Sequence, residues 1–115
     1  MPLDALDTVE AIEVLENYLS RNRPPEHIRN KLDIGYRIEN QSIYLFEIRP
    51  DWQNPNITRN EDYAKTTFVK RQKVWKVYWL RADLKWHPYD PKPQVRNLSD
   101  FIKLVEEDKH ACFNG

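Results

Sequence analysis

Residues 74–89 read Val-Trp-Lys-Val-Tyr-Trp-Leu, then Arg-Ala-Asp, then Leu-Lys-Trp-His-Pro-Tyr. In the first seven residues, the large apolar side chains of Trp75, Val77 and Trp79 are separated by one residue each. A period of two is typical of a strand with one buried face. We therefore predict strands over 74–80 and 84–88, joined by a turn at 81–83. The hairpin holds three of the four tryptophans, so it must supply much of the core.

The two faces of this hairpin differ in chemical character. Three tryptophans, Trp75, Trp79 and Trp86, are expected to pack beneath helices, because large apolar groups gain most from burial. The other face mixes cations with aromatic residues, and we expect it to remain open. The residues predicted to share this open face are Lys65, Lys76, Tyr78, Lys85 and His87.

The period of two also predicts strands on the N-terminal side of the hairpin. These strands are expected over 33–39, 42–49 and 63–70. Residues 50–62 are then predicted to form one long loop, which contains Trp52. A loop tryptophan either closes the rim of the core or anchors a partner, so Trp52 is a candidate contact residue.

Helical periodicity appears at both ends of the chain. Asp7 followed by Glu10 resembles a capping box at the start of the first helix, and a start at Pro2 or Leu3 fits the sequence equally well. This helix is expected to end near Ser20, because the Pro24-Pro25 pair cannot continue a helix. A short second helix is expected over 25–31, with a proline in its first position. A last amphipathic helix is expected to be capped by Ser99 or Asn97, to continue through Val105 and to fray towards the C-terminal end.

This order of elements defines the fold class. One helix, five antiparallel strands and a further helix predict an α+β fold: a five-stranded antiparallel meander with an N-terminal and a C-terminal helix covering one face. A chain of 115 residues is long enough for one core, so we expect a single domain over residues 1–115. One face of the sheet is then left to solvent or to a partner.

The composition excludes several classes of protein. The only glycines are Gly35 and Gly115, so no glycine-rich loop is present to hold a nucleotide phosphate. The single cysteine, Cys112, rules out an intramolecular disulfide, and no apolar run approaches the roughly 20 residues of a membrane span. We expect a soluble protein of the cytoplasm.

Charge is unevenly distributed along the chain, although 18 basic and 18 acidic residues cancel. Residues 1–20 carry five carboxylates and no Lys or Arg. Residues 65–96 carry nine Lys or Arg and two aspartates. A separation of this size points either to a charged partner or to one part of the protein neutralising another.

Several short pieces of the chain form a recognisable pattern. They are Ile48-Arg49-Pro50-Asp51-Trp52, Ala64-Lys65, Trp75-x-x-Tyr78-Trp79 and Asp83-x-Lys85-Trp86-His87-x-Tyr89. Over residues 30–90 the chain resembles an uncharacterised family of short bacterial proteins, a domain of unknown function. The resemblance implies a bacterial cytoplasmic protein, and it brings no established activity and no functional residues.

The interleaved cations and aromatic residues support two interpretations. Single-stranded nucleic acid binders hold phosphates with cations and stack bases on exposed rings, at about 1–3 kcal/mol per base. A packed sheet with a solvated cationic outer face has the same pattern. We predict a non-catalytic binding module whose partner is nucleic acid. The alternative is contact with another protein or a second copy, and no membrane contact is expected.

The weakest alternative is a Mg²⁺-dependent nuclease. One nuclease superfamily places an Asp at a strand end and a Glu-x-Lys on the next strand, and Asp33 and Glu47 fit the two carboxylate positions. Arg49 occupies the lysine position, and its pKa is too high for proton transfer. We therefore expect no catalytic residue, no metal and no cofactor.

Overall fold

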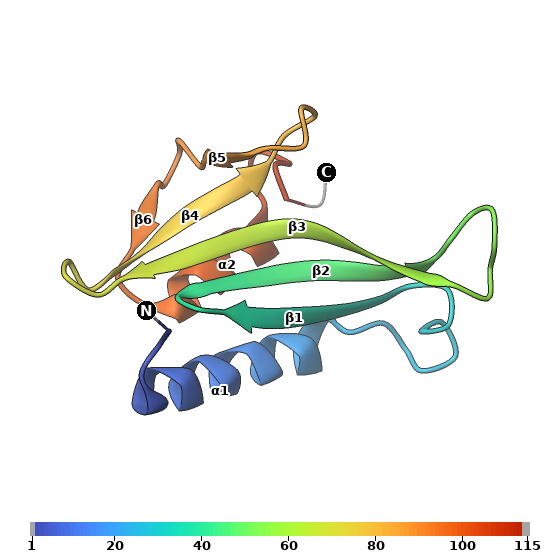
Figure 1. The fold of residues 1–115 in the computed structure, drawn as a ribbon, viewed down its shortest axis with the longest axis horizontal. Coiled ribbons are helices and arrows are strands. Elements are labelled where there is room, and N and C mark those ends of the chain that lie inside the picture. The colour runs from blue at the N-terminus through green and yellow to red at the C-terminus, as the bar shows by residue number, and fades with distance from the viewer. Residues whose placement is uncertain (1, 114–115) are drawn as a thin grey trace.

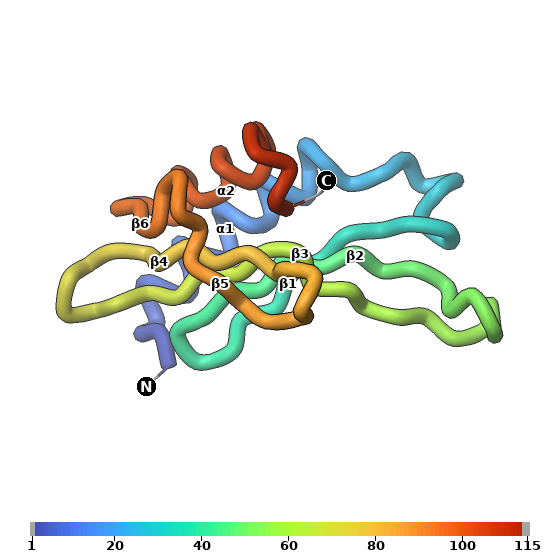
Figure 2. Tube along the Cα trace, turned by 90° about the horizontal axis from the view of Figure 1, so that it is seen from above, coloured from blue at the N-terminus to red at the C-terminus, as the bar shows by residue number. Residues whose placement is uncertain are grey.

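The computed structural model describes residues 2–113, and both helices lie on one side of a single sheet (Figures 1 and 2). The elements are α1 (Ala5–Asn22), β1 (Asp33–Glu39), β2 (Ser42–Pro50), β3 (Thr58–Val69), β4 (Val74–Leu80), β5 (Trp86–Pro88), β6 (Gln94–Val95) and α2 (Leu98–Glu107). All pairings are antiparallel in the order β1-β2-β3-β4-β5, and β6 also pairs with β4. This confirms the predicted α+β meander with two helices on one face.

Helix α1 starts at Ala5, between the two starts that the sequence allowed. The Asp7 N–H donates to Asp4 Oδ1 at 2.8 Å, so Asp4 is the cap and Asp7 lies inside the first turn. The predicted second helix over 25–31 is wrong. Most backbone bonds there span three residues, as from Ile28 N–H to the Pro25 carbonyl at 2.9 Å, so the segment is a series of turns. No helix within residues 2–113 has the length and hydropathy needed to cross a membrane.

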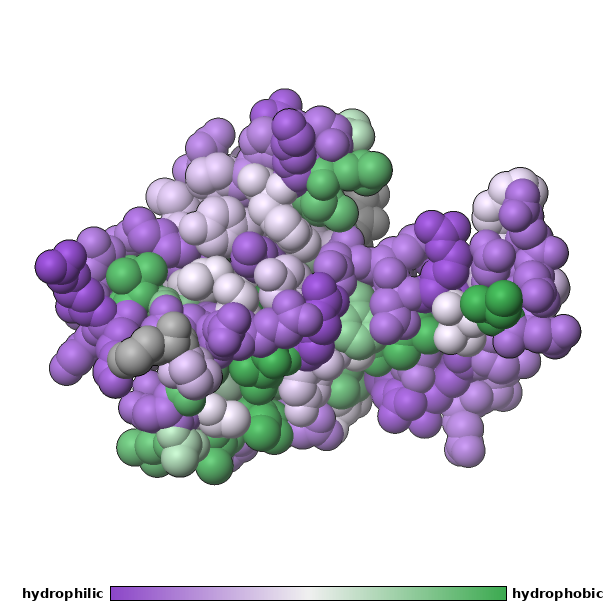
Figure 3. All heavy atoms as spheres, in the orientation of Figure 1, coloured by the Kyte–Doolittle hydropathy of each residue, from purple (hydrophilic) through white to green (hydrophobic). Residues whose placement is uncertain are grey.

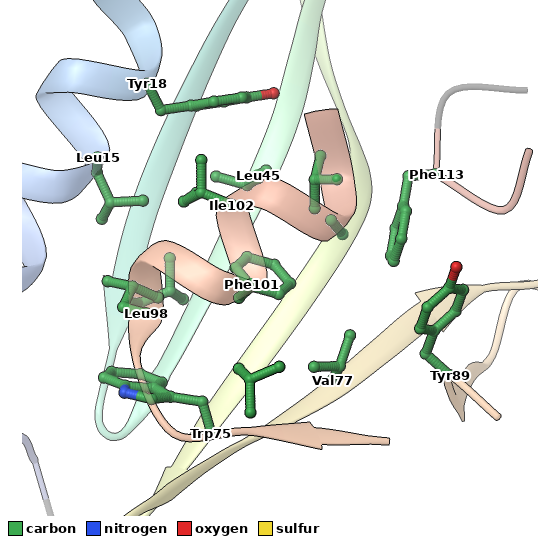
Figure 4. Packing of buried hydrophobic residues seen from close by; sticks show 14 of the residues in the cluster. Leu15, Tyr18, Leu45, Trp75, Val77, Tyr89, Leu98, Phe101, Ile102 and Phe113 are labelled. Atoms are coloured by element: carbon green, nitrogen blue, oxygen red, sulfur yellow. The ribbon is translucent and has the colours of Figure 1, made fainter. Parts of the chain in front are cut away.

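The core lies between the two helices and the sheet (Figure 4). Helix α1 contributes Ala11, Leu15 and Tyr18, and α2 contributes Leu98, Phe101, Ile102 and Val105. From the sheet, the most deeply buried side chains are Ile43, Leu45, Ala64, Thr66 and Val77. Because these residues alternate along their strands, the neighbouring residues must face away from the helices.

The two helices are also joined by polar contacts at their C-terminal ends. Arg21 donates from Nε and Nη2 to the two carboxylate oxygens of Glu106, at 3.2 and 3.1 Å. Asn22 Nδ2 donates to Glu106 Oε2 at 2.7 Å. The Arg21 guanidinium holds the pKa of the Glu106 carboxyl below its usual range.

The hairpin of β2 and β3 extends well beyond the helices (Figure 1). Its connecting loop is residues 51–57, so the long loop predicted over 50–62 is wrong in its second half. Residues 58–62 read Thr-Arg-Asn-Glu-Asp, and they show no apolar alternation because neither face of this arm is covered. Only the pairing with β2, such as Arg49 opposite Arg59, reveals them as strand.

A β-bulge at Tyr63 changes the facing of β3. Leu45 pairs with Ala64 while Phe46 pairs with Asp62, so Tyr63 is the extra residue. Tyr63 therefore points toward the helices, where its hydroxyl lies 2.6 Å from that of Tyr18. Asp62 is turned to the open face instead. Both Tyr63 and Ala64 are buried on the helix side.

The free edge of β4 is covered by a broken strand. β5 holds only Trp86–Pro88, because Leu84 has a φ of 63° and belongs to the turn, so the predicted start of this strand at residue 84 is wrong. After β5, Tyr89 N–H donates to the Val77 carbonyl at 2.9 Å and its ring is buried. β6 then rejoins the same edge, where Gln94 pairs with Lys76.

We expect replacement of either tyrosine in the Tyr18–Tyr63 pair by phenylalanine to lower the free energy of unfolding by about 1–2 kcal/mol, because the remaining hydroxyl loses its partner in the core. The double variant should lose less than the sum of the two. Urea unfolding of all four proteins measures the coupling. Tyr36→Phe is the matched control, since the Tyr36 bond to Glu16 is exposed. Strictly additive losses would contradict a direct bond.

Stability should also depend on Asp33 below neutral pH. Arg23 donates to both oxygens of Asp33, at 2.9 and 2.7 Å, and holds the pKa of this buried carboxyl below its usual value. Because the pKa of Asp33 is lower in the folded protein than in the unfolded chain, the ion pair stabilises the fold fully at pH values above the unfolded pKa of about 3.9. This stabilisation is lost as the pH falls through the folded pKa.

Asp33→Asn should therefore cost about 1 kcal/mol at pH 7, or roughly 4 °C in Tm, and the difference from wild type should shrink as the pH falls below about 3.9. Thermal unfolding followed across this pH range measures it. Asp51→Asn is the control, because Asp51 lies 3.8 Å from Arg59 in a longer and therefore weaker pair. An unchanged difference between pH 7 and the acid end would refute the linkage.

Candidate functional site

Aromatic and cationic side chains gather around Lys65 on the face of the sheet that the helices leave open. We call this group the Lys65 cluster; its members are Arg37, Tyr44, Lys65, Tyr78 and Trp86. The strand pairing aligns four of them in one row across β1 to β4, and Trp86 follows on β5. In Figure 1 the strands pass in front of α2, so Figure 3 shows this face, where side chains of intermediate hydropathy lie among hydrophilic ones.

Lys65 is surrounded by three aromatic rings. Its Nζ lies 5.3 Å from the ring centroid of Tyr44, 5.4 Å from that of Tyr78 and 5.9 Å from that of Trp86. These distances are within the range of cation–π attraction, worth about 0.5–1 kcal/mol at exposed sites. Among residues 2–113, no carboxylate forms an ion pair with Lys65.

Arg37 fixes one side of the cluster. Its Nη1 and Nη2 donate to the two oxygens of Asp62 at 2.6 and 3.0 Å, and its Nε donates to Glu39 at 3.1 Å. These carboxylates raise the pKa of Arg37, so the guanidinium is charged at every accessible pH. The same group lies 4.1 Å from the ring centroid of Tyr44. Arg37 is therefore already neutralised, and it supports the Tyr44 ring.

Gly35 makes room for the aromatic side chain next to Arg37. It pairs with Phe46, and a Cβ at Gly35 would meet the Phe46 ring at 3.0 Å. The ring covers the glycine backbone and is itself almost fully buried although it lies on the open face. This end of the open face is thus closed by packing.

Three of the six residues predicted as contacts lie together. Lys65 and Tyr78 belong to the cluster, and Lys76 is two residues from Tyr78 along β4, in the row of Thr67 and Gln94. Lys76 also forms no ion pair with any residue from 2 to 113. The open face therefore carries two cations without a carboxylate partner in the described chain.

His87 and Lys85 do not lie on this face as predicted. His87 pairs with Trp79, which places it on the helix side, and its Nε2 lies 2.8 Å from Asp83 Oδ2. Lys85 precedes β5 in the exposed turn, where its N–H donates to Asp83 Oδ1 at 2.9 Å. The prediction assumed a strand that begins at residue 84. Because the strand begins after the turn, Trp86 lies on the open face, where we had expected Lys85 and His87.

Trp86 consequently lies outside the helix-covered core, contrary to the expectation for the three tryptophans of the hairpin. Its ring meets that of Tyr44 edge-on, with centroids 6.0 Å apart. Trp75 is buried beneath the helices as expected, and Trp79 is half-buried beside them. The aromatic residues of the open face could be found from the alternation along each strand. Tyr44, for example, lies between the buried Ile43 and Leu45 and must therefore face the other side of the sheet.

Trp52 is separated from the other predicted contacts. It is 80% exposed in the loop 51–57, at the tip of the β2–β3 hairpin and at the far end of the molecule from β6 (Figure 1). Ile57 in the same loop is 54% exposed. Trp52 therefore does not close the rim of the core, and it is not part of the Lys65 cluster.

The two carboxylates considered for a nuclease do not converge. Asp33 pairs with Ile48 and its neighbour Ile34 pairs with Glu47, so the register assigns Asp33 and Glu47 to opposite faces. Arg23 binds both oxygens of Asp33, and Glu47 accepts a bond from Arg49 at 3.2 Å. No group of three or more His, Cys, Asp or Glu side chains within residues 2–113 is placed to hold a metal ion.

Comparison with known proteins gives the family. A family model described as "Domain of unknown function (DUF3024)" matches residues 3–115, which extends the resemblance beyond residues 30–90 to both helices. No curated protein and no solved structure matches the chain. The chain therefore belongs to the DUF3024 family, a domain of unknown function.

Proposed function

We propose that this protein is a non-catalytic binding module that contacts single-stranded nucleic acid through the open face of its sheet. The observation that supports the proposal is the ammonium of Lys65 among three aromatic rings, with no carboxylate of residues 2–113 paired to it. Lys76 adds a second such cation on the same face. Rings for stacking and cations for phosphates are the two requirements of this kind of binding.

The internal contacts of Lys65 and the contacts of a bound ligand are of similar energy, so a ligand can replace the internal ones. The contacts of Lys65 with its rings are each worth about 0.5–1 kcal/mol at an exposed site. Stacking a base on an aromatic ring is worth about 1–3 kcal/mol, and the released ammonium can then pair with a phosphate. Arg37 already covers Tyr44, so Tyr78 and Trp86 are the rings that would receive bases.

The charge contribution is tested by titrating a fluorescent single-stranded oligonucleotide at several salt concentrations. Each phosphate contact on a single strand adds about 0.7 to the slope of log K against log salt. Lys65→Gln with Lys76→Gln should therefore lower the slope by about 1.4. Lys31→Gln with Arg59→Gln is the matched control, since it removes the same charge from two exposed positions outside the open-face cluster. Salt-independent binding, or no binding to any oligonucleotide, would overturn the proposal in favour of a protein partner.

The stacking contribution is tested separately by Trp86→Leu. We expect affinity to fall by about 1–3 kcal/mol while the salt slope stays the same, because a ring is lost and no charge changes. Trp52→Leu is the matched control, since Trp52 lies at the distal hairpin tip, and it should bind as wild type does. Circular dichroism confirms that both variants are folded. Equal losses in the two variants would show that the open face has no special role.

A further inference from the structure

A second cationic surface lies beside the open face, in a groove between the β3–β4 turn, β6 and α2. The groove encloses ≈ 920 Å³. Its lining includes four cations, Lys73, Lys92, Arg96 and Lys103, and two carboxylates, Asp100 and Glu107. All four cations are exposed. Two of the segments that line it, β6 and the β3–β4 turn, lie at the end of the molecule opposite the tip of the β2–β3 hairpin (Figure 1).

The carboxylates of this groove do not neutralise its cations. Asp100 accepts a bond from Asn97 Nδ2 at 3.3 Å, and Glu107 lies 3.7 Å from Lys109. Within residues 2–113, none of the four cations forms an ion pair. The groove is therefore a net positive surface with room for a phosphate-bearing ligand.

The carboxylates at the start of α1 lie near only some of the cations of this groove. A neighbouring groove of ≈ 570 Å³ is lined by three carboxylates at the start of α1 and by three cations. The carboxylates are the N-cap Asp4, Asp7 and Glu10, and the cations are Lys70, Lys73 and Arg96. The α1 carboxylates thus share a surface with two of the four cations, Lys73 and Arg96. Lys92 and Lys103 line only the larger groove and lie outside this internal neutralisation.

The groove borders the open face at Gln94. Gln94 of β6 lines the groove and pairs with Lys76 of β4, which is on the open face. Lys76 is two residues along β4 from Tyr78, a distance of about 7 Å. A strand that leaves the Lys65 cluster past Lys76 therefore reaches the groove directly over the β6 edge.

We infer that the groove holds the phosphates of the same nucleic acid strand whose bases stack on the Lys65 cluster. This inference rests on the proposed function and extends it to a binding path that runs from Trp86 and Tyr78, past Lys76, to Lys92 and Lys103. The path predicts that a short oligonucleotide occupies the cluster alone. A longer oligonucleotide contacts both surfaces.

The test compares oligonucleotides of about 4 and about 16 nucleotides, the range of site sizes in small single-strand binders. Lys92→Gln with Lys103→Gln should lower the salt slope by about 1.4 for the long oligonucleotide and leave the short one unchanged. Lys31→Gln with Arg59→Gln, at the other end of the molecule, removes the same charge and should change neither slope. All of these side chains are exposed, so the variants should fold as wild type does.

The outcomes separate the two proposals. If the Lys65 and Lys76 variant weakens both oligonucleotides while the groove variant weakens neither, the open face binds and the groove proposal is wrong. If only the groove variant weakens binding, the groove holds phosphates and the role of the open face is wrong. Equal effects of the groove variant on both lengths would refute the path. A complete lack of binding by wild type would refute both proposals.

Discussion

The insertion of one residue into β3, at Tyr63, is the constraint on which much of the remaining structure depends. Without the bulge, strict alternation would send Tyr63 to the open face and Asp62 toward the helices. With it, the Tyr63 hydroxyl meets Tyr18 of α1 in the core, at 2.6 Å. Asp62 meanwhile receives the Arg37 guanidinium on the other side of the sheet. A single backbone irregularity thus docks α1 and fixes one end of the Lys65 cluster.

The two faces of the sheet are stabilised by different interactions. The helix side is held by apolar burial, with Leu15, Leu45 and Phe101 fully removed from water. The open side is held by contacts among half-exposed groups: Arg37 over Tyr44, and Lys65 among its rings. Such contacts are individually weak and exchangeable, unlike those of the core. That difference is why we assign ligand contact to the open face.

The cations of residues 65–96 are not gathered on one face of the sheet. Lys65 and Lys76 lie on it, while others lie at the β3–β4 turn or line the grooves beside α2. The acidic start of α1 lines one groove together with Lys70 and Arg96. Part of the charge that is separated along the chain is therefore neutralised within the fold. In the binding path that we infer, a polyanion meets the remaining cations, from the open face to the α2 groove, without crossing the acidic helix.

The sequence by itself determined the fold class and the face of most strands, because the alternation in Val74 to Leu80 and around Ile43 follows directly from the geometry of a half-buried strand. It also identified Lys65, Lys76 and Tyr78 as residues of one face. The tertiary structure alone decided the bulge at Tyr63, the turn that reversed the expected phases of Trp86 and His87, and the polar start of β3. Each of these depends on pairing with a distant strand, and local periodicity contains no record of a one-residue shift in register.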